Sequence, residues 1–216
     1  MSQIGTILLA VLLTFSHSII KGIAAKVAQA LGNRQASRYF VYIWGIAAIA
    51  AALFMQNNFV YRLPTVDRTV ILAALTIAIV NLFVAKYSGY RPVGRLNVIN
   101  FIVFYPIFEE VVFRGLILPV LNEIFPYAFM EIAYLPVSFS VIISAFLFAI
   151  AHFQYYQFGR LSIRYMSFAF IGGIFFGAIA NVTQSILIPV LLHIEYNLLS
   201  ACYSFKYDKE PEKAAL

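Results

Sequence analysis

Long apolar segments recur along this chain, separated by short polar stretches. A transmembrane helix needs about 20 consecutive, mostly apolar residues. Seven segments meet that description, and they cover approximately residues 3–20, 39–56, 69–87, 97–121, 139–154, 165–183 and 185–204. The pattern predicts an all-α fold, a polytopic bundle of about seven membrane-spanning helices.

The stretch between the fourth and fifth segments departs from this pattern. Residues 122–138 contain two prolines and two acidic residues, which are Pro126, Pro136, Glu123 and Glu131. Proline does not fit the interior of a long helix. We predict a short interfacial helix here, and an eighth, partial span is the alternative.

Composition agrees with a membrane protein. The chain is 62% hydrophobic and 11% charged, whereas soluble domains carry about 25% charged residues. A soluble fold of this size cannot bury so much apolar surface. Without repeats or linkers, the chain is expected to form one transmembrane domain over residues 1–216. No basic stretch interleaved with aromatic residues is present, so we expect no nucleic-acid partner.

The basic residues between the segments predict an orientation. If the N-terminus faces outside, twelve lysines and arginines fall on the cytoplasmic side. They are Lys21, Lys26, Arg34, Arg38, Lys86, Arg91, Arg95, Arg160, Arg164, Lys206, Lys209 and Lys213. Only Arg62 and Arg68 fall on the other side. Cytoplasmic loops of membrane proteins are enriched in Lys and Arg, so we predict seven spans with a cytoplasmic C-terminus. The first segment lacks a positive leading region and a cleavage site, and we expect it to be retained.

Several ionisable or strongly polar residues interrupt the apolar segments. Each ionisable residue inside a span costs about 2.5–3.5 kcal/mol on insertion scales, so such residues indicate function. They include Glu109, Glu110 and Arg114 in the fourth segment, His152 in the fifth, and His193, Glu195 and Asn197 in the seventh.

Helical spacing relates these residues to one another. Glu110 and Arg114 lie four residues apart on one helix face, where they can form an ion pair. Glu109 is rotated by about 100° from Glu110 and points elsewhere. We predict that Glu109 converges with His152, His193 and Asn197 in one cytoplasm-facing cavity.

The same residues form three motifs, which are Glu109-Glu110-x-x-x-Arg114, Phe148-x-x-x-His152 and His193-x-x-x-Asn197. In order and separation they resemble the signature of the CAAX-protease and bacteriocin-processing (Abi) family of intramembrane proteases, which includes the CAAX prenyl endopeptidase of the Rce type. The resemblance covers roughly residues 95–205, which we take as the catalytic core.

The resemblance implies hydrolysis of a peptide bond in a membrane-associated substrate. It implies that Glu109 activates a water molecule that His152 helps to hold. His193 and Asn197 would stabilise the oxyanion. Glu110 and Arg114 would form a supporting ion pair, and Phe148 would pack beneath His152.

A metal is the alternative to this mechanism. Glu109, His152 and His193 match the ligand count of a catalytic zinc site, so the enzyme is expected to be of either the glutamate type or the metallo type. No HExxH sequence is present, and the three groups lie on separate segments. We favour a mechanism without metal and assign no cofactor.

Two other functions fit buried Glu and His. A small proton-coupled transporter would use them as relay groups, although no inverted repeat is visible. A non-catalytic immunity protein would bind a peptide without cleaving it. The expected partners are the lipid bilayer and a prenylated CAAX-like protein, a bacteriocin precursor or another membrane-anchored peptide. The expected location is a bacterial plasma membrane.

Three further aromatic or polar residues are assigned to packing. His17 in the first segment is expected to make a hydrogen bond between helices or to lie at the interface. Tyr155 and Tyr156 follow His152. They could shape a substrate entrance, but we favour anchoring in the interfacial aromatic belt.

Overall fold

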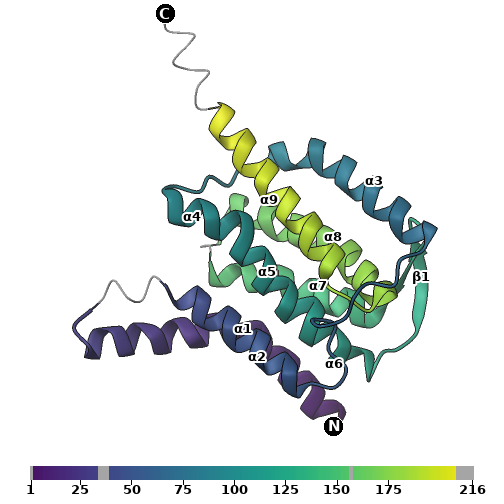
Figure 1. Cartoon of the computed structure of the whole chain (residues 1–216), viewed down its shortest axis with the longest axis horizontal. Helices are drawn as coiled ribbons and strands as arrows, with labels where there is room; N and C mark the ends of the chain where they lie inside the picture. The colour runs from purple at the N-terminus through teal and green to yellow at the C-terminus, as the bar shows by residue number, and fades with distance from the viewer. Residues whose placement is uncertain (1, 34–38, 156–157, 208–216) are drawn as a thin grey trace, which may run out of the picture.

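The fold is known from a computed structural model, which describes residues 2–33, 39–155 and 158–207. It is mainly helical (Figure 1). Five residues used in the predictions above lie outside these ranges, namely Arg34, Arg38, Tyr156, Lys209 and Lys213.

The first part of the chain forms three apolar helices. They are α1 (Gln3–Ala30), α2 (Phe40–Phe54) and α3 (Arg68–Val84), and α3 continues into the 3-10 turn η2 (Ala85–Tyr87). The side chain of Ser2 accepts a hydrogen bond from Gly5 N at 3.1 Å, and that of Asp67 accepts one from Val70 N at 2.8 Å. These residues cap the N-terminal N–H groups of α1 and α3.

The fourth predicted segment is one long helical rod with two π-helical stretches. It runs through α4 (Arg95–Ile99), η3 (Asn100–Phe104), α5 (Tyr105–Glu110), η4 (Val111–Ile117) and α6 (Leu118–Asn122). The backbone stays in the right-handed helical region at each junction. π-Helical turns are rare and occur frequently at functional sites, and the acidic residues lie between the two stretches.

The helix predicted within residues 122–138 is wrong. Strands β1 (Ala128–Ile132) and β2 (Leu135–Ser138) form an antiparallel hairpin instead. Ile132 pairs with Leu135, so the loop has two residues, Ala133 and Tyr134, and both have positive φ. Positive φ at both loop positions matches the twist of hairpin strands. The fold is therefore helical with one small hairpin.

The last part of the chain supplies three more helices. They are α7 (Phe139–Ala151), which continues into the 3-10 turn η5 (His152–Gln154), α8 (Arg160–Thr183) and α9 (Leu187–Tyr207). Helices α7 and α8 approach closely at Gly173, where an added Cβ would lie 3.0 Å from the Cβ of Ala145. The small residue allows this close contact between helices.

All seven predicted segments coincide with helices. Among the described residues, three helices are long and apolar enough to cross a membrane, namely Gln3–Ala30, Arg68–Tyr87 and Arg160–Thr183. Two shorter apolar helices are Phe40–Phe54 and Phe139–Gln154.

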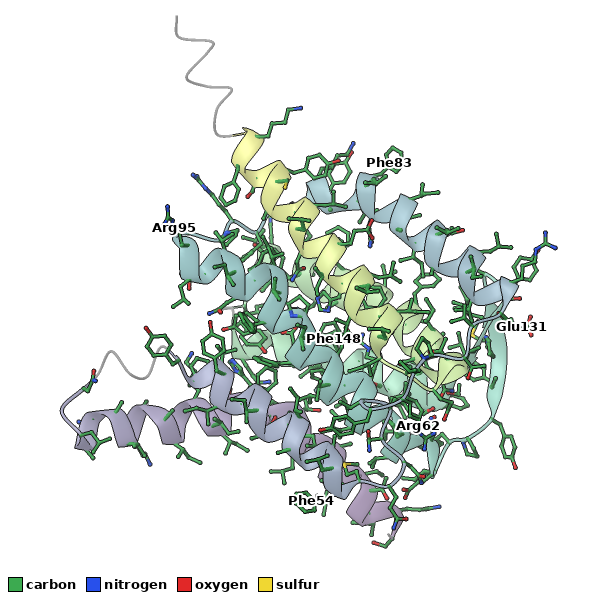
Figure 2. The ribbon with its side chains drawn as sticks, in the orientation of Figure 1. Phe54, Arg62, Phe83, Arg95, Glu131 and Phe148 are labelled. Carbon is green, nitrogen blue, oxygen red and sulfur yellow. The ribbon has the colours of Figure 1, made fainter. Side chains whose placement is uncertain are left out.

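The rod containing α5 and helix α9 lie at the middle of the bundle, with α1 and α2 on one side and α3 on the opposite side (Figure 1). Phe148 lies in the interior, whereas Phe54 and Phe83 project outward from α2 and α3 (Figure 2). Phe54 is 87% exposed. Large apolar side chains on the outside are expected where lipid is the solvent.

Candidate active site

Glu110 is the centre of a buried polar network. Its Oε1 atom accepts hydrogen bonds from Arg114 Nη1 at 3.0 Å and from His193 Nδ1 at 2.9 Å. Glu110 and Arg114 are completely buried. The predicted pairing across four residues is therefore present, and it extends to α9. Charged hydrogen bonds of this kind offset part of the cost of burying both ions.

This network fixes the orientation of the His193 ring. A carboxylate oxygen can only accept a hydrogen bond, so His193 Nδ1 carries a proton and donates a hydrogen bond to Glu110. His193 Nε2 then faces Glu109, whose Oε2 atom is 3.9 Å away. That separation exceeds a direct hydrogen bond and is suited to a bridging oxygen atom.

The Arg114 guanidinium lies between two aromatic rings. Its central carbon is 4.4 Å from the ring centroid of Phe148 and 5.8 Å from that of Phe176. Cation–π contacts stabilise a buried guanidinium. Phe148 also contacts the rings of His152 and His193, with centroid distances of 5.0 and 5.9 Å. Phe148 therefore joins the ion pair to both histidines, and Figure 2 shows it in the interior.

His152 lies where α7 changes into the 3-10 turn η5. Its Nδ1 atom is 2.9 Å from the carbonyl oxygen of Phe148 one turn earlier. A carbonyl only accepts, so Nδ1 carries the proton and Nε2 keeps its lone pair when the ring is neutral. His152 thus presents an acceptor atom.

Asn197 binds a carbonyl that the π-helical backbone releases. In η3 the Tyr105 N–H donates to the Asn100 carbonyl, five residues back. In this register the Phe101 carbonyl would accept from Pro106, which has no N–H. Asn197 Nδ2 donates to it instead, at 2.7 Å. In a regular α-helix a proline leaves the carbonyl four residues back without a donor, whereas the carbonyl that Asn197 binds lies five residues before Pro106.

A cavity of about 1210 Å³ opens beside these groups. Glu109, His152, His193, Asn197 and Phe148 all line it, whereas Glu110 and Arg114 do not. Its other walls come from α1, α3, α8 and the hairpin. The four residues predicted to react converge on one cavity together with Phe148, whereas Glu110 and Arg114, the predicted supporting ion pair, do not line it.

A zinc site would require at least three His, Cys, Asp or Glu side chains close enough together to bind one metal ion. Within residues 2–33, 39–155 and 158–207, no group of three His, Cys, Asp or Glu side chains could hold a metal ion. Glu109, His152 and His193 share the cavity without forming such a ligand set. The choice between the glutamate type and the metallo type therefore stays a prediction.

Tyr155 and His17 also lie at the site, although anchoring in the interfacial belt was favoured over a substrate entrance for Tyr155, and a packing role was predicted for His17. Both line the cavity, and the centroids of their rings are 4.5 Å apart. His17 is 2% exposed, and neither ring nitrogen has a partner among the described residues. The predicted hydrogen bond or interfacial position of His17 is wrong. Aromatic rings surround it instead, and only the position of Tyr155, three residues after His152 of the FxxxH motif, could have pointed to this group.

Comparison with known families agrees with the geometry. A family model described as "Type II CAAX prenyl endopeptidase Rce1-like" matches residues 91–199, half of the chain. The chain belongs to this Rce1-like family. Neither the curated proteins nor the solved structures provide a significant match.

Membership of the Rce1-like family makes the chain an integral membrane protein and an endopeptidase. The matched segment contains all seven motif residues from Glu109 to Asn197 and the helices that carry them. Helices α1, α2 and α3 precede it, although α1 and α3 also line the cavity.

Proposed function

We propose that this chain is a glutamate-type intramembrane endopeptidase that cleaves a membrane-associated peptide or protein with a CAAX-like end. The observation that carries the proposal is the 3.9 Å separation of Glu109 Oε2 and His193 Nε2 at the wall of the cavity. A carboxylate and an imidazole at this distance can hold one oxygen atom between them.

In the proposed reaction, Glu109 removes a proton from a water molecule in the cavity. The Nε2 lone pair of His152 accepts the second proton of that water in a hydrogen bond and so orients it. The water oxygen attacks the scissile carbonyl carbon and forms a tetrahedral intermediate. When the C–N bond breaks, the proton held by Glu109 passes to the leaving nitrogen, and the carboxylate is regenerated.

The oxyanion of the intermediate needs donors that are fixed in advance. When His193 carries two protons, Nδ1–H donates to Glu110 and Nε2–H is directed into the cavity. Glu110 then stabilises the imidazolium charge. Asn197 has a second N–H besides the Nδ2 hydrogen bond to Phe101. We assign these two groups to the oxyanion.

The family and the cavity both support the proposed substrate class. The family description names a prenylated CAAX end, and a lipid chain needs an apolar surface. Such a surface is present on α3 and α8, where the cavity lining includes Leu72, Ile77, Val80, Phe168 and Phe175. A prenylated protein fits this better than a soluble peptide, and a bacteriocin precursor is the alternative.

The proposed setting keeps the topology predicted from the sequence. Seven spans would place the N-terminus outside and the C-terminus in the cytoplasm of a bacterial plasma membrane. The whole chain would form one transmembrane domain, with the catalytic core at residues 95–205. Substrate would then reach the cavity from the cytoplasmic leaflet.

The proposal is tested by cleavage in detergent. Wild type, Glu109→Gln and His193→Ala are purified, and thermal melts establish equal folding. Each is assayed with prenylated and unprenylated fluorogenic peptides, with and without a strong chelator. We expect cleavage by wild type only, unaffected by chelator, and a loss of at least about 10³-fold in Glu109→Gln. Glu131→Gln is the matched control, because Glu131 is exposed on the hairpin (Figure 2).

Other results would change the assignment. Activity that a chelator removes and zinc restores would replace the glutamate mechanism with a metal mechanism. Absence of cleavage with every peptide would contradict the endopeptidase, and flux through liposomes would then test the transporter alternative.

A further inference from the structure

A single lysine faces the cavity, Lys21 of α1. Among the described residues, no other lysine or arginine lines the cavity, and Glu109, the proposed general base, is the only acidic residue that does. No ion pair joins Lys21 to an acidic residue in the described part of the chain. The charge of Lys21 is therefore available to an anionic group of a ligand.

Aromatic rings support the Lys21 side chain without neutralising its charge. Its Nζ atom is 5.7 Å from the ring centroid of Phe40, the first residue of α2. Phe40 in turn packs edge-on against His17, with the ring centroids 4.9 Å apart, and both rings line the cavity. A cation–π contact attracts an ammonium group but leaves its N–H groups able to donate hydrogen bonds. We call these three residues the α1 end of the cavity.

The α1 end lies a short peptide length from the proposed general base. His17 and Tyr105 join α1 to the rod, with ring centroids 6.3 Å apart. Lys21 follows His17 by one turn of α1. Glu109 likewise follows Tyr105 by one turn of the rod. Because α1 and the rod run in opposite directions (Figure 1), these two turns add to about 11 Å, close to the span of about 10 Å of three extended residues.

The apolar wall of the cavity lies on the other side of the reacting groups. Helices α3 and α8 form it, and Figure 1 shows α3 and α1 on opposite sides of the rod that carries Glu109. A ligand that reaches both places needs an apolar chain, a negative charge and a short peptide between them. A prenylated CAAX end has these parts, because its cysteine carries the lipid and the three residues that follow end in a free carboxylate.

We propose that Lys21 binds the C-terminal carboxylate of the substrate, while the prenyl chain lies against α3 and α8. The inference rests on the proposed function and deepens it by giving the direction in which the substrate lies. A carboxylate without a partner is costly to bury, and the Glu109 carboxylate repels a second one. Pairing with Lys21 therefore holds the C-terminus away from Glu109. It places beside Glu109 the peptide bond three residues from the C-terminus.

Two peptides that differ in one group test this pairing. Both carry the same prenylated CAAX sequence, one with a free C-terminal carboxylate and the other with a carboxamide. We expect wild type to show about a tenfold higher KM for the carboxamide, the effect of one charge-assisted hydrogen bond, with kcat nearly unchanged. Lys21→Met should raise the KM for the carboxylate peptide to that for the carboxamide. Lys21→Arg keeps the charge and should keep most of the preference.

Lys26→Met is the matched control. Lys26 is exposed on the same helix and does not line the cavity, so this variant should keep the wild-type preference for the carboxylate. If Lys21 only anchored α1 at the membrane interface, Lys21→Met would change the KM values of both peptides by the same factor or leave both unchanged. Either result, or a wild type that does not distinguish the peptides, would overturn the proposal.

A binding measurement separates this inference from the proposed function. In the Glu109→Gln protein, fluorescence anisotropy of labelled peptides reports affinity without turnover, and the carboxylate peptide should bind about tenfold more tightly than the carboxamide. Adding Lys21→Met should remove that difference. If wild type cleaves no peptide but the difference in affinity is present, the proposed function is wrong and the carboxylate site stands. If wild type cleaves both peptides with one KM and the affinities are equal, the site is wrong and the proposed function stands.

Discussion

Helices α1 and α3 both flank the bundle, and both precede the family-matched segment, but they contact the site differently. Helix α1 meets the turn that follows α7, through the Gln154 amide and the His17 ring. Helix α3 attaches to α9, where Asn81 donates to the Leu192 carbonyl at 3.2 Å and to Glu195 Oε2 at 3.0 Å. The contacts of α1 therefore reach the turn η5 that begins at His152, whereas those of α3 reach α9 next to His193.

Helices α1 and α3 also differ in how many of their side chains line the cavity. One face of α3 lines the cavity opposite α8, with Leu72, Thr76 and Val80 among the lining residues. In α1 only His17 and Lys21 line the cavity. The difference suggests that α1 sets the geometry of the reaction, while α3 forms a wall beside which an apolar substrate chain can lie.

The largest effect on stability is expected in the buried network of Glu110, Arg114 and His193. Arg114→Met leaves Glu110 buried without its cation, and breaking a buried pair costs about 3–5 kcal/mol. We expect a large fall in melting temperature and loss of activity. Arg95→Met, at an exposed arginine of α4, is the control. An Arg114→Met protein as stable as wild type would show that aromatic packing, not charge pairing, stabilises the centre.

The second-largest effect on stability is expected at Gly173 of α8, where this helix packs against Ala145 of α7. In Gly173→Ala the added Cβ would lie 3.0 Å from the Ala145 Cβ and 3.1 Å from Arg114 Nη2. Overpacking of this kind costs about 1–3 kcal/mol. Gly172→Ala is the adjacent control, since nothing lies within 4 Å of its added Cβ. Chemical denaturation of both variants should separate them, and equal stability would contradict the close packing of α7 on α8.

A smaller effect tests α3 directly. Asn81→Leu removes two hydrogen bonds and is expected to cost about 1–2 kcal/mol. Because Asn81 lines the cavity on α3, KM should rise roughly two- to tenfold, with kcat unchanged. Steady-state kinetics of Asn81→Leu beside wild type are the measurement. A fall in kcat alone in Asn81→Leu would remove the distinction between the helices.

The smallest effect is expected on the outer face of α3. Phe83 is 62% exposed and projects outward (Figure 2). Phe83→Leu keeps an apolar side chain at this surface and should change stability by less than about 0.5 kcal/mol. Melting temperature and kcat are the measurements. A large loss of stability would indicate that this face binds another protein instead of lipid.

Local patterns in the sequence were sufficient to predict the helical segments and one ion pair of the site. Hydropathy located all seven helical segments, because a helix in lipid needs a continuous apolar run. Spacing of four residues predicted the Glu110–Arg114 pair, because such residues share a helix face. The hairpin was missed because its loop residues, Ala133 and Tyr134, lack the Asn-Gly or Asp-Gly signal of a two-residue turn.

The sequence by itself determined the membrane character, the helical segments and the motifs that identify the family. Each of these depends on neighbours within one helix or on residue types in order. Only the tertiary structure decided that Glu110 binds His193, that Asn197 binds the Phe101 carbonyl, and that Gln154 bridges a turn of α1. These contacts join residues 83 to 140 positions apart. No helical period relates such residues, and packing of the helices alone brings them together.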